Sequence, residues 1–105
     1  MTSARRYVHV TIKPEERDRI KEFETELDKA SDWYRYAPNS WVVVTSKPIE
    51  TWYNRLRPYL DNDDSMLICE FDPGSCQGWM SQKFWDWLNK SRKTHPPLKS
   101  ISSAD

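Results

Sequence analysis

The feature of the sequence that most limits its fold is the order in which two hydrophobic periodicities follow one another. Four runs rich in β-branched and aromatic residues alternate with two amphipathic stripes of helical period. The predicted strands cover residues 5–13, 33–37, 41–45 and 65–72, and the predicted helices cover 15–30 and 48–60. The order β-α-β-β-α-β predicts an α+β fold of the ferredoxin-like type, with a four-stranded antiparallel sheet and both helices on one face.

Prolines and turn residues mark the boundaries of these elements. Pro14 ends the first strand, and Pro38-Asn39-Ser40 supplies the turn of a hairpin between the second and third strands. Pro48 suits the first turn of the second helix, where a backbone N–H is not needed. Pro58 falls late in that helix and removes one backbone hydrogen bond, which predicts a distorted last turn.

A third, shorter helix is predicted after the last strand, over residues 81–90, with Ser81 as its N-cap. Its aromatic residues cannot all face one stripe, so we expect this helix to pack on two sides. Beyond it the sequence has too few apolar residues to fold. We therefore predict a ferredoxin-like domain over residues 1–91 and a disordered basic tail over residues 92–105.

The charge balance limits how this chain can bind an anionic partner. Sixteen Lys and Arg residues balance sixteen Asp and Glu residues, so no uniform basic field exists to hold nucleic acid or a membrane. The basic residues gather toward the two ends, whereas the middle is acidic. The candidate nucleic-acid contacts are Arg5, Arg6, Arg35, Lys90, Arg92 and Lys93. Solvated termini with no role in binding are the simpler interpretation of the same residues.

The two cysteines and the N-terminal segment indicate the compartment. Cys69 and Cys76 are seven residues apart, which matches neither a redox CxxC pair nor half of a common zinc site. We expect two reduced thiols, no cofactor and no bound metal. The first residues show no apolar stretch of the length that a signal peptide or a membrane span needs. The sequence thus predicts a soluble, cytoplasmic protein that does not associate with membranes.

Several tryptophan-containing segments carry a resemblance to a small bacterial family that is called SinR-like. They are Asp32-Trp33-Tyr34-Arg35-Tyr36, Ser40-Trp41-Val42-Val43, the run from Leu56 to Ile68, Gly78-Trp79-Met80 and Trp85-Asp86-Trp87-Leu88. This resemblance implies a ferredoxin-like fold similar to that of the CRISPR-associated adaptation proteins described as endoribonucleases. It also implies a homodimer and a role beside mobile-element or defence machinery.

The resemblance breaks down at the residue that would carry catalysis. In the nuclease relatives an aspartate at the end of the first strand is the proposed magnesium ligand. Here Thr11 or Ile12 falls at that position, and neither binds a hard cation as a carboxylate does. We therefore expect a non-catalytic homodimeric binding or scaffold module. The alternatives are a divalent-metal nuclease, for which Glu70 and Asp72 are the acids to test, and a nucleic-acid binder that uses its basic termini.

Two further candidates for chemistry have simpler structural interpretations. His9 stands alone on the first strand, and a strand histidine without a visible partner is more often structural than catalytic. The acidic cluster of Asp61, Asp63 and Asp64 lacks the glycine and the glutamate that a calcium-binding EF-hand loop requires. We expect this cluster to be a helix-to-strand loop.

The aromatic hairpin allows comparison with sheets that stack unpaired bases. Trp33 and Arg35 should share one face of their strand, and Tyr34 and Tyr36 the other. Because Arg35 is the only basic residue between Trp33 and Trp41, core or dimer packing is the favoured interpretation of these rings. In a ferredoxin-like sheet the face opposite the two helices stays open unless the third helix or a second subunit covers it, which favours a homodimer.

Overall fold

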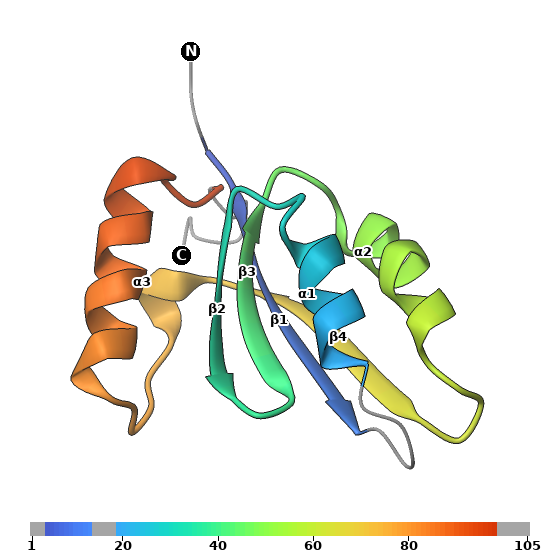
Figure 1. Ribbon diagram of the computed structural model, residues 1–105. Coiled ribbons are helices and arrows are strands. Elements are labelled where there is room, and N and C mark those ends of the chain that lie inside the picture. The colour runs from blue at the N-terminus through green and yellow to red at the C-terminus, as the bar shows by residue number, and fades with distance from the viewer. Residues whose placement is uncertain (1–3, 14–18, 99–105) are drawn as a thin grey trace.

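A computed structural model describes residues 4–13 and 19–98 of the chain. The strands are β1 (Arg6–Lys13), β2 (Asp32–Ala37), β3 (Ser40–Thr45) and β4 (Ser65–Phe71). The helices are α1 (Ile20–Leu27), α2 (Ile49–Leu56) and α3 (Gln82–Thr94), and the short 3₁₀ turns are η1 (Arg57–Tyr59) and η2 (Pro73–Ser75). The predicted order of elements is confirmed, including the third helix (Figure 1).

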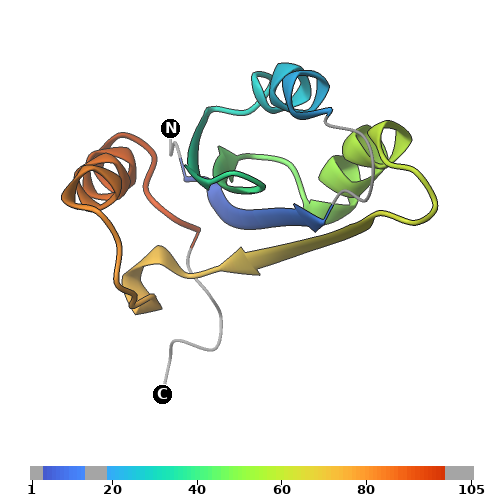
Figure 2. The same cartoon turned by 60° about the horizontal axis from the view of Figure 1, so that its bottom comes forward.

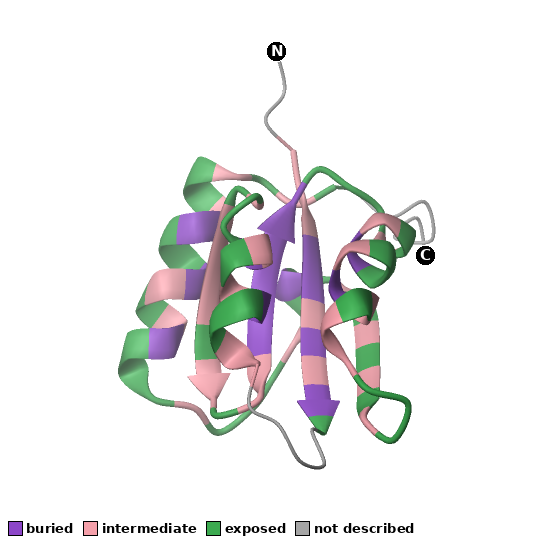
Figure 3. Cartoon of the chain, turned by 45° about the vertical axis from the view of Figure 1, so that its right-hand side comes forward, coloured by how far each residue is buried: buried purple, intermediate pink, exposed green. Residues whose placement is uncertain are grey.

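The four strands form one sheet in the order β2-β3-β1-β4, and every neighbouring pair is antiparallel. This confirms the α+β fold with a four-stranded antiparallel sheet. In the register of the central strand, His9 lies opposite Val42 of β3 on one side and Cys69 of β4 on the other. Figure 3 shows that β3 is buried along almost its whole length, whereas no residue of the edge strand β4 is fully buried.

Helices α1 and α2 cover one face of the sheet and enclose the larger core with it. Alternate residues of β1 and β3, such as Val10 and Trp41, point into this core and are fully buried. Phe23 of α1 stacks on Trp41 with ring centroids 5.6 Å apart, and Trp52 of α2 is also fully buried. The narrow apolar stripes predicted for the two helices are therefore the faces that they bury.

Helix α3 covers part of the opposite face, so the sheet lies between two helical layers (Figure 1). Tyr7, Val42 and Val44 project from the sheet toward Phe84 and Leu88 of α3. The alternation predicted for β2 is confirmed, because Trp33 packs with the α1 and α2 core while Tyr34 and Tyr36 pack against α3. The third helix thus packs on the sheet of its own chain, which removes the main physical reason for expecting a second subunit on that face.

The ends of the helices follow the predicted signals in two cases. The Ser81 hydroxyl accepts a hydrogen bond from the Phe84 N–H at 3.2 Å and caps α3. At Pro58 the second helix tightens into η1, which is the distortion expected from a missing N–H. The first helix is observed from Ile20 to Leu27, and residues 15–18 of its predicted span lie outside the described residues.

The predicted boundary at residue 92 differs from what the structure shows. Helix α3 continues to Thr94, and the segment after it pairs with Arg5, the residue that precedes β1. The Arg5 N–H donates to the Pro96 carbonyl at 2.8 Å, and the Leu98 N–H donates to the Arg5 carbonyl at 2.9 Å. This pairing fixes residues 96–98 through backbone groups, so few apolar side chains are needed there. Residues 99–105 of the expected tail lie outside the described residues.

Candidate functional site: an aromatic pocket beside the third helix

A pocket with a volume of about 330 Å³ lies on the α3 side of the sheet. The strands contribute His9, Tyr36, Val42 and Phe71, and α3 contributes Phe84 and Trp85. The remaining lining residues, Cys76, Gln77, Gly78 and Met80, belong to the segment that connects β4 with α3. We call this the aromatic pocket.

The path of the chain explains why a hollow forms here. Figure 2 follows the chain from β4 through η2 and around to the start of α3. Helix α3 contacts β2, and the Trp87 indole N–H donates to the Asp32 carboxylate of β2 at 2.9 Å. Because α3 is anchored over β2 and β3, it leaves part of β1 and β4 uncovered. The connecting segment closes the far side of this uncovered strip and so completes the pocket.

The polar centre of the aromatic pocket is a pair formed by His9 and Tyr36. The His9 Nε2 and Tyr36 Oη atoms are hydrogen-bonded, and the two rings stack with centroids 5.6 Å apart at an interplanar angle of 29°. Burial of the imidazole lowers the pKa of His9 below its ordinary value of 6.5. His9 is therefore neutral at neutral pH, and none of the lining residues is an acid or a Lys or Arg.

Rigid ring contacts shape the walls of the aromatic pocket. Phe84 meets Tyr36 edge to face at a centroid distance of 6.0 Å and meets Trp85 in the same way at 5.1 Å. Phe71 meets the buried Tyr7 ring edge to face at 6.3 Å. Such contacts hold aromatic side chains in fixed orientations. The pocket is thus largely preformed, with several ring surfaces facing its interior.

An unusually exposed tryptophan lies beside the aromatic pocket. Trp79 is 101% exposed, although both of its neighbours in the chain, Gly78 and Met80, line the pocket. Leu67 of β4 is also exposed, at 58%, and lies two residues before the exposed thiol of Cys69. The pocket therefore opens next to apolar surface that the described part of the chain does not cover.

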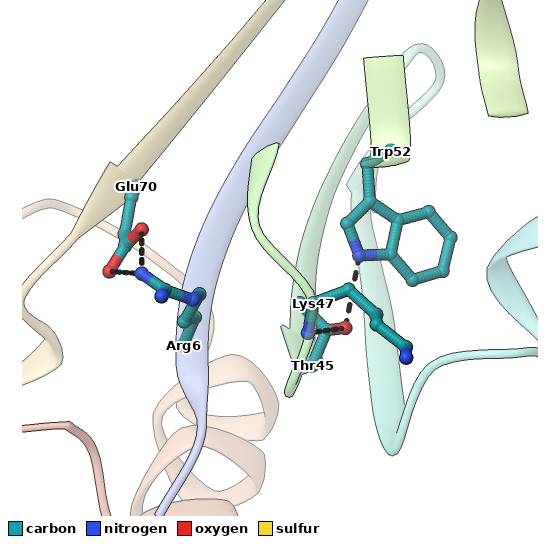
Figure 4. A network of polar contacts seen from close by, with 5 residues as sticks. All are labelled: Arg6, Thr45, Lys47, Trp52 and Glu70. Carbon is teal, nitrogen blue, oxygen red and sulfur yellow. Dashed lines mark hydrogen bonds and ion pairs between the residues drawn. The ribbon is translucent and has the colours of Figure 1, made fainter. Parts of the chain in front are cut away.

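The acids proposed for metal-dependent cleavage have other partners. Glu70 forms an ion pair with Arg6 at 3.0 Å (Figure 4). The carboxylate of Asp72 accepts hydrogen bonds from the Gly74 N–H at 2.9 Å and from the Ser75 hydroxyl at 3.2 Å. Over residues 4–13 and 19–98, no three His, Cys, Asp or Glu side chains are grouped in a way that could hold a metal ion.

Thr11 and Ile12, the first-strand residues singled out by the resemblance, have structural contacts. The Thr11 hydroxyl is hydrogen-bonded to the Ser40 hydroxyl at 2.9 Å, and Ile12 is buried in the core beneath α1 and α2.

In the acidic loop, the Asp64 carboxylate accepts a hydrogen bond from the Asp61 N–H at 2.8 Å, while Asp61 also pairs with Arg19 at 3.5 Å. These contacts agree with the expected structural role of the loop.

The six predicted nucleic-acid contacts do not form a single surface. The Arg35 guanidinium donates to the Pro38 carbonyl at the hairpin end of the sheet, at 2.6 Å from Nη2. Arg6 is paired with Glu70, and Arg5 donates from Nε to the Ser31 hydroxyl at 2.9 Å. Arg92 and Lys93 line a separate hollow with Asn89 and Pro97, and Lys90 lies on the exposed side of α3. Arg5, which bridges to Pro97, also lies near this hollow, so it joins Arg92 and Lys93 there.

The aromatic hairpin is part of the protein interior and not an open stacking platform. Trp41 is fully buried, and its indole N–H donates to Glu24 at 3.1 Å. Tyr34 packs between Phe84 and Trp87 of α3. Core packing is therefore the correct interpretation of most of these rings, and Tyr36 is the one that also faces the pocket.

The aromatic pocket could not be found from the sequence because its parts come together only through strand order. His9 and Tyr36 lie on β1 and β2, which are separated by β3 in the sheet. The structure thus supplies the partner that His9 lacks in the sequence. The sequence held one signal of the pocket, in the segment that connects β4 with α3. There Trp79 stands between two small or flexible residues, after a glycine-containing turn.

Comparison with known proteins assigns neither a family nor a function to this chain. No family model, no curated protein and no solved structure matches the chain. The resemblance to the SinR-like family therefore stays a prediction.

Among the described residues, no helix is both long enough and apolar enough to span a membrane. Cys69 and Cys76 are both free thiols.

Proposed function

We propose that the protein is a non-catalytic binding module of the ferredoxin-like type, whose aromatic pocket takes up an uncharged, ring-bearing group. We further propose that the chain associates as a homodimer when this pocket is empty of ligand. The observation that carries the proposal is the pocket of about 330 Å³, whose lining combines aromatic rings with the hydrogen-bonded His9–Tyr36 pair. The element order and the strand order β2-β3-β1-β4 are compatible with the ferredoxin-like type.

The size and lining of the pocket favour a small flat group. Ligand pockets have volumes of about 300–1,000 Å³ and combine apolar walls with few polar groups that fix orientation. Here the walls are Phe71, Phe84 and Trp85, and the orienting groups are His9 and Tyr36. A ring with one hydrogen-bonding edge could stack on the walls and direct that edge toward the His9–Tyr36 pair.

The electrostatics of the pocket favour a neutral group. Burying a charge without a partner costs far more than burying an apolar ring. No acid, Lys or Arg lines the pocket, and burial keeps His9 neutral because it lowers the pKa of the imidazole. An anionic or cationic ring would therefore lose its hydration without gaining an ion pair.

The absence of catalysis in this proposal rests on what the candidate acids do. Glu70 is engaged by Arg6, and Asp72 holds η2 through two hydrogen bonds. The resemblance to the SinR-like family implies that Thr11 or Ile12 falls where its nuclease relatives have an acid. A role beside mobile-element or defence machinery is supported by the resemblance to the SinR-like family and by no contact within the molecule.

Titration of the isotopically labelled protein with indole tests the proposal. We expect saturable NMR shifts at His9, Gly78 and Trp85, and weaker shifts with indole-3-acetate, which has a similar ring system and carries a carboxylate. Met80→Glu places a charge in the lining and should abolish the shifts, whereas Met80→Leu keeps an apolar side chain and should preserve them. Indole that causes no saturable shift in the pocket, or equal binding by Met80→Glu, would refute the proposal.

A further inference from the structure

Trp79 is the most exposed large apolar side chain among the described residues. Its exposed fraction of 101% means that its indole contacts no other part of the folded domain. Tryptophan is highly buried on average, and exposed tryptophans are enriched where one protein binds another. The position of Trp79 beside the aromatic pocket therefore calls for a partner that covers it.

The pocket and the tryptophan are built from one segment. Gly78 and Met80 line the pocket, and Trp79 between them does not. A surface that carries both a protruding ring and a ring-sized hollow is self-complementary. Two copies related by a two-fold axis near this segment could exchange the ring in both directions at once, which is the geometry of an isologous interface.

The area that such an exchange would bury is that of a weak, transient dimer. A fully exposed tryptophan buries up to about 250 Å² on insertion, and the exposed lining of the receiving pocket is smaller than that. Two reciprocal insertions therefore remove less than about 1,000 Å² from solvent, which is the range of weak and transient interfaces. Leu67 is 58% exposed and, four residues before Phe71 on β4, adds apolar surface on the same side of the sheet.

Electrostatics do not oppose this contact. The formal net charge of the chain is zero, so two copies do not repel each other as charged bodies. The lining of the pocket contains no acid, Lys or Arg that the incoming indole would have to desolvate. The lining also offers polar groups to the indole N–H, because His9 and Tyr36 belong to it.

We propose that, in the absence of ligand, Trp79 of each copy fills the aromatic pocket of a second copy, so that dimerisation and ligand binding exclude each other. This inference rests on the proposed function, because it assigns the same pocket to a tryptophan of the partner. It makes the homodimer a closed, ligand-free form and the ligand-bound chain a monomer.

Sedimentation velocity over a range of protein concentrations tests the inference. We expect a reversible monomer-dimer equilibrium whose dissociation constant rises by at least about 30-fold in Trp79→Ala, the loss typical of an interface hot spot. Tyr53→Ala is the matched control, because Tyr53 is a 51% exposed aromatic residue on α2, on the opposite side of the sheet, and its removal should change nothing. Met80→Glu should weaken the dimer as Trp79→Ala does, and indole should dissociate the wild-type dimer.

The outcomes separate this inference from the proposed function. A wild-type chain that stays monomeric up to its solubility limit, or a dimer insensitive to Trp79→Ala, overturns the inference. A concentration-independent blue shift of Trp79 fluorescence would assign the ring to the pocket of its own chain and would also overturn it. In each of these cases saturable indole binding by Trp79→Ala keeps the proposed ligand-binding role of the pocket, whereas loss of indole binding in that folded variant removes that role as well.

Discussion

His9 of β1 and Tyr36 of β2 are hydrogen-bonded across the face of β3, the strand that lies between them. The pair spans Val42, which is directly opposite His9 in the β1–β3 register. It therefore ties the outer strand of the hairpin to the central strand on the side where α3 leaves the sheet partly uncovered. The same pair belongs to the polar part of the lining of the aromatic pocket, so its protonation state matters for both stability and binding.

The stability of the protein should fall as His9 becomes protonated. Burial lowers the pKa of His9 in the folded state below 6.5, the ordinary value that applies to the unfolded chain. Between these two pKa values the unfolded chain binds more protons than the folded one. The contribution of His9 is therefore fully present above pH 6.5 and is lost as the pH falls toward the folded pKa.

Urea unfolding between about pH 7.5 and about pH 5.5, above the range where most carboxylates titrate, measures this dependence. We expect the free energy of unfolding to decrease over that range in the wild type and to change less in His9→Gln. An equal slope in the two proteins would show that another group is responsible.

The docking of α3 should depend on the hydroxyl group of Tyr7. Tyr7 is 1% exposed, and its hydroxyl donates to the His95 carbonyl at 2.9 Å and is hydrogen-bonded to Ser91 at 3.1 Å. Tyr7→Phe leaves these buried groups without their partner, which should cost about 1–3 kcal/mol in the free energy of unfolding. Native-state hydrogen exchange should show faster opening of α3 than of β3. Uniform acceleration over the whole sheet would contradict this local anchoring.

Local periodicity was sufficient to predict the framework of the fold. The alternation in residues 41–45 places Val42 and Val44 on one face and Trp41 and Val43 on the other, and the structure has this arrangement. Ser81 and Pro58 are local signals with direct backbone consequences, and both act as predicted. Such features depend on neighbours within a few residues, so a single sequence contains them.

The features that the sequence did not predict depend on distant pairings. The first part of the expected tail is ordered because Arg5 pairs with Pro96 and Leu98, more than ninety positions away. His9 has a partner in Tyr36 only because β1 and β2 both flank β3. Neither relationship produces a periodic pattern or a motif in the sequence, because both arise from the way the strands and helices assemble.

A buried hydroxyl should be essential where β3 leads into α2. The Thr45 hydroxyl accepts hydrogen bonds from the Trp52 indole N–H and from the Lys47 backbone N–H, both at 3.0 Å (Figure 4). Thr45 is 2% exposed, so Thr45→Val leaves two donors without an acceptor at nearly constant volume. We expect a loss of about 1–3 kcal/mol in the free energy of unfolding, measured by urea denaturation. Thr45→Ser retains the acceptor and should lose less; an equal loss would assign the effect to packing.

The two acids at the end of β4 should prove structural when tested for catalysis. We expect no cleavage of labelled RNA or DNA by the purified protein with magnesium or manganese, because Glu70 pairs with Arg6 and Asp72 holds the turn before the pocket. Asp72→Asn should instead lower the free energy of unfolding by about 1 kcal/mol, since an amide is a weaker acceptor for the Gly74 N–H. A change at this turn would also move the segment that carries Trp79, so indole binding should weaken in the same variant. Cleavage by the wild type that disappears in folded Asp72→Asn or Glu70→Gln would establish the nuclease and overturn the binding module.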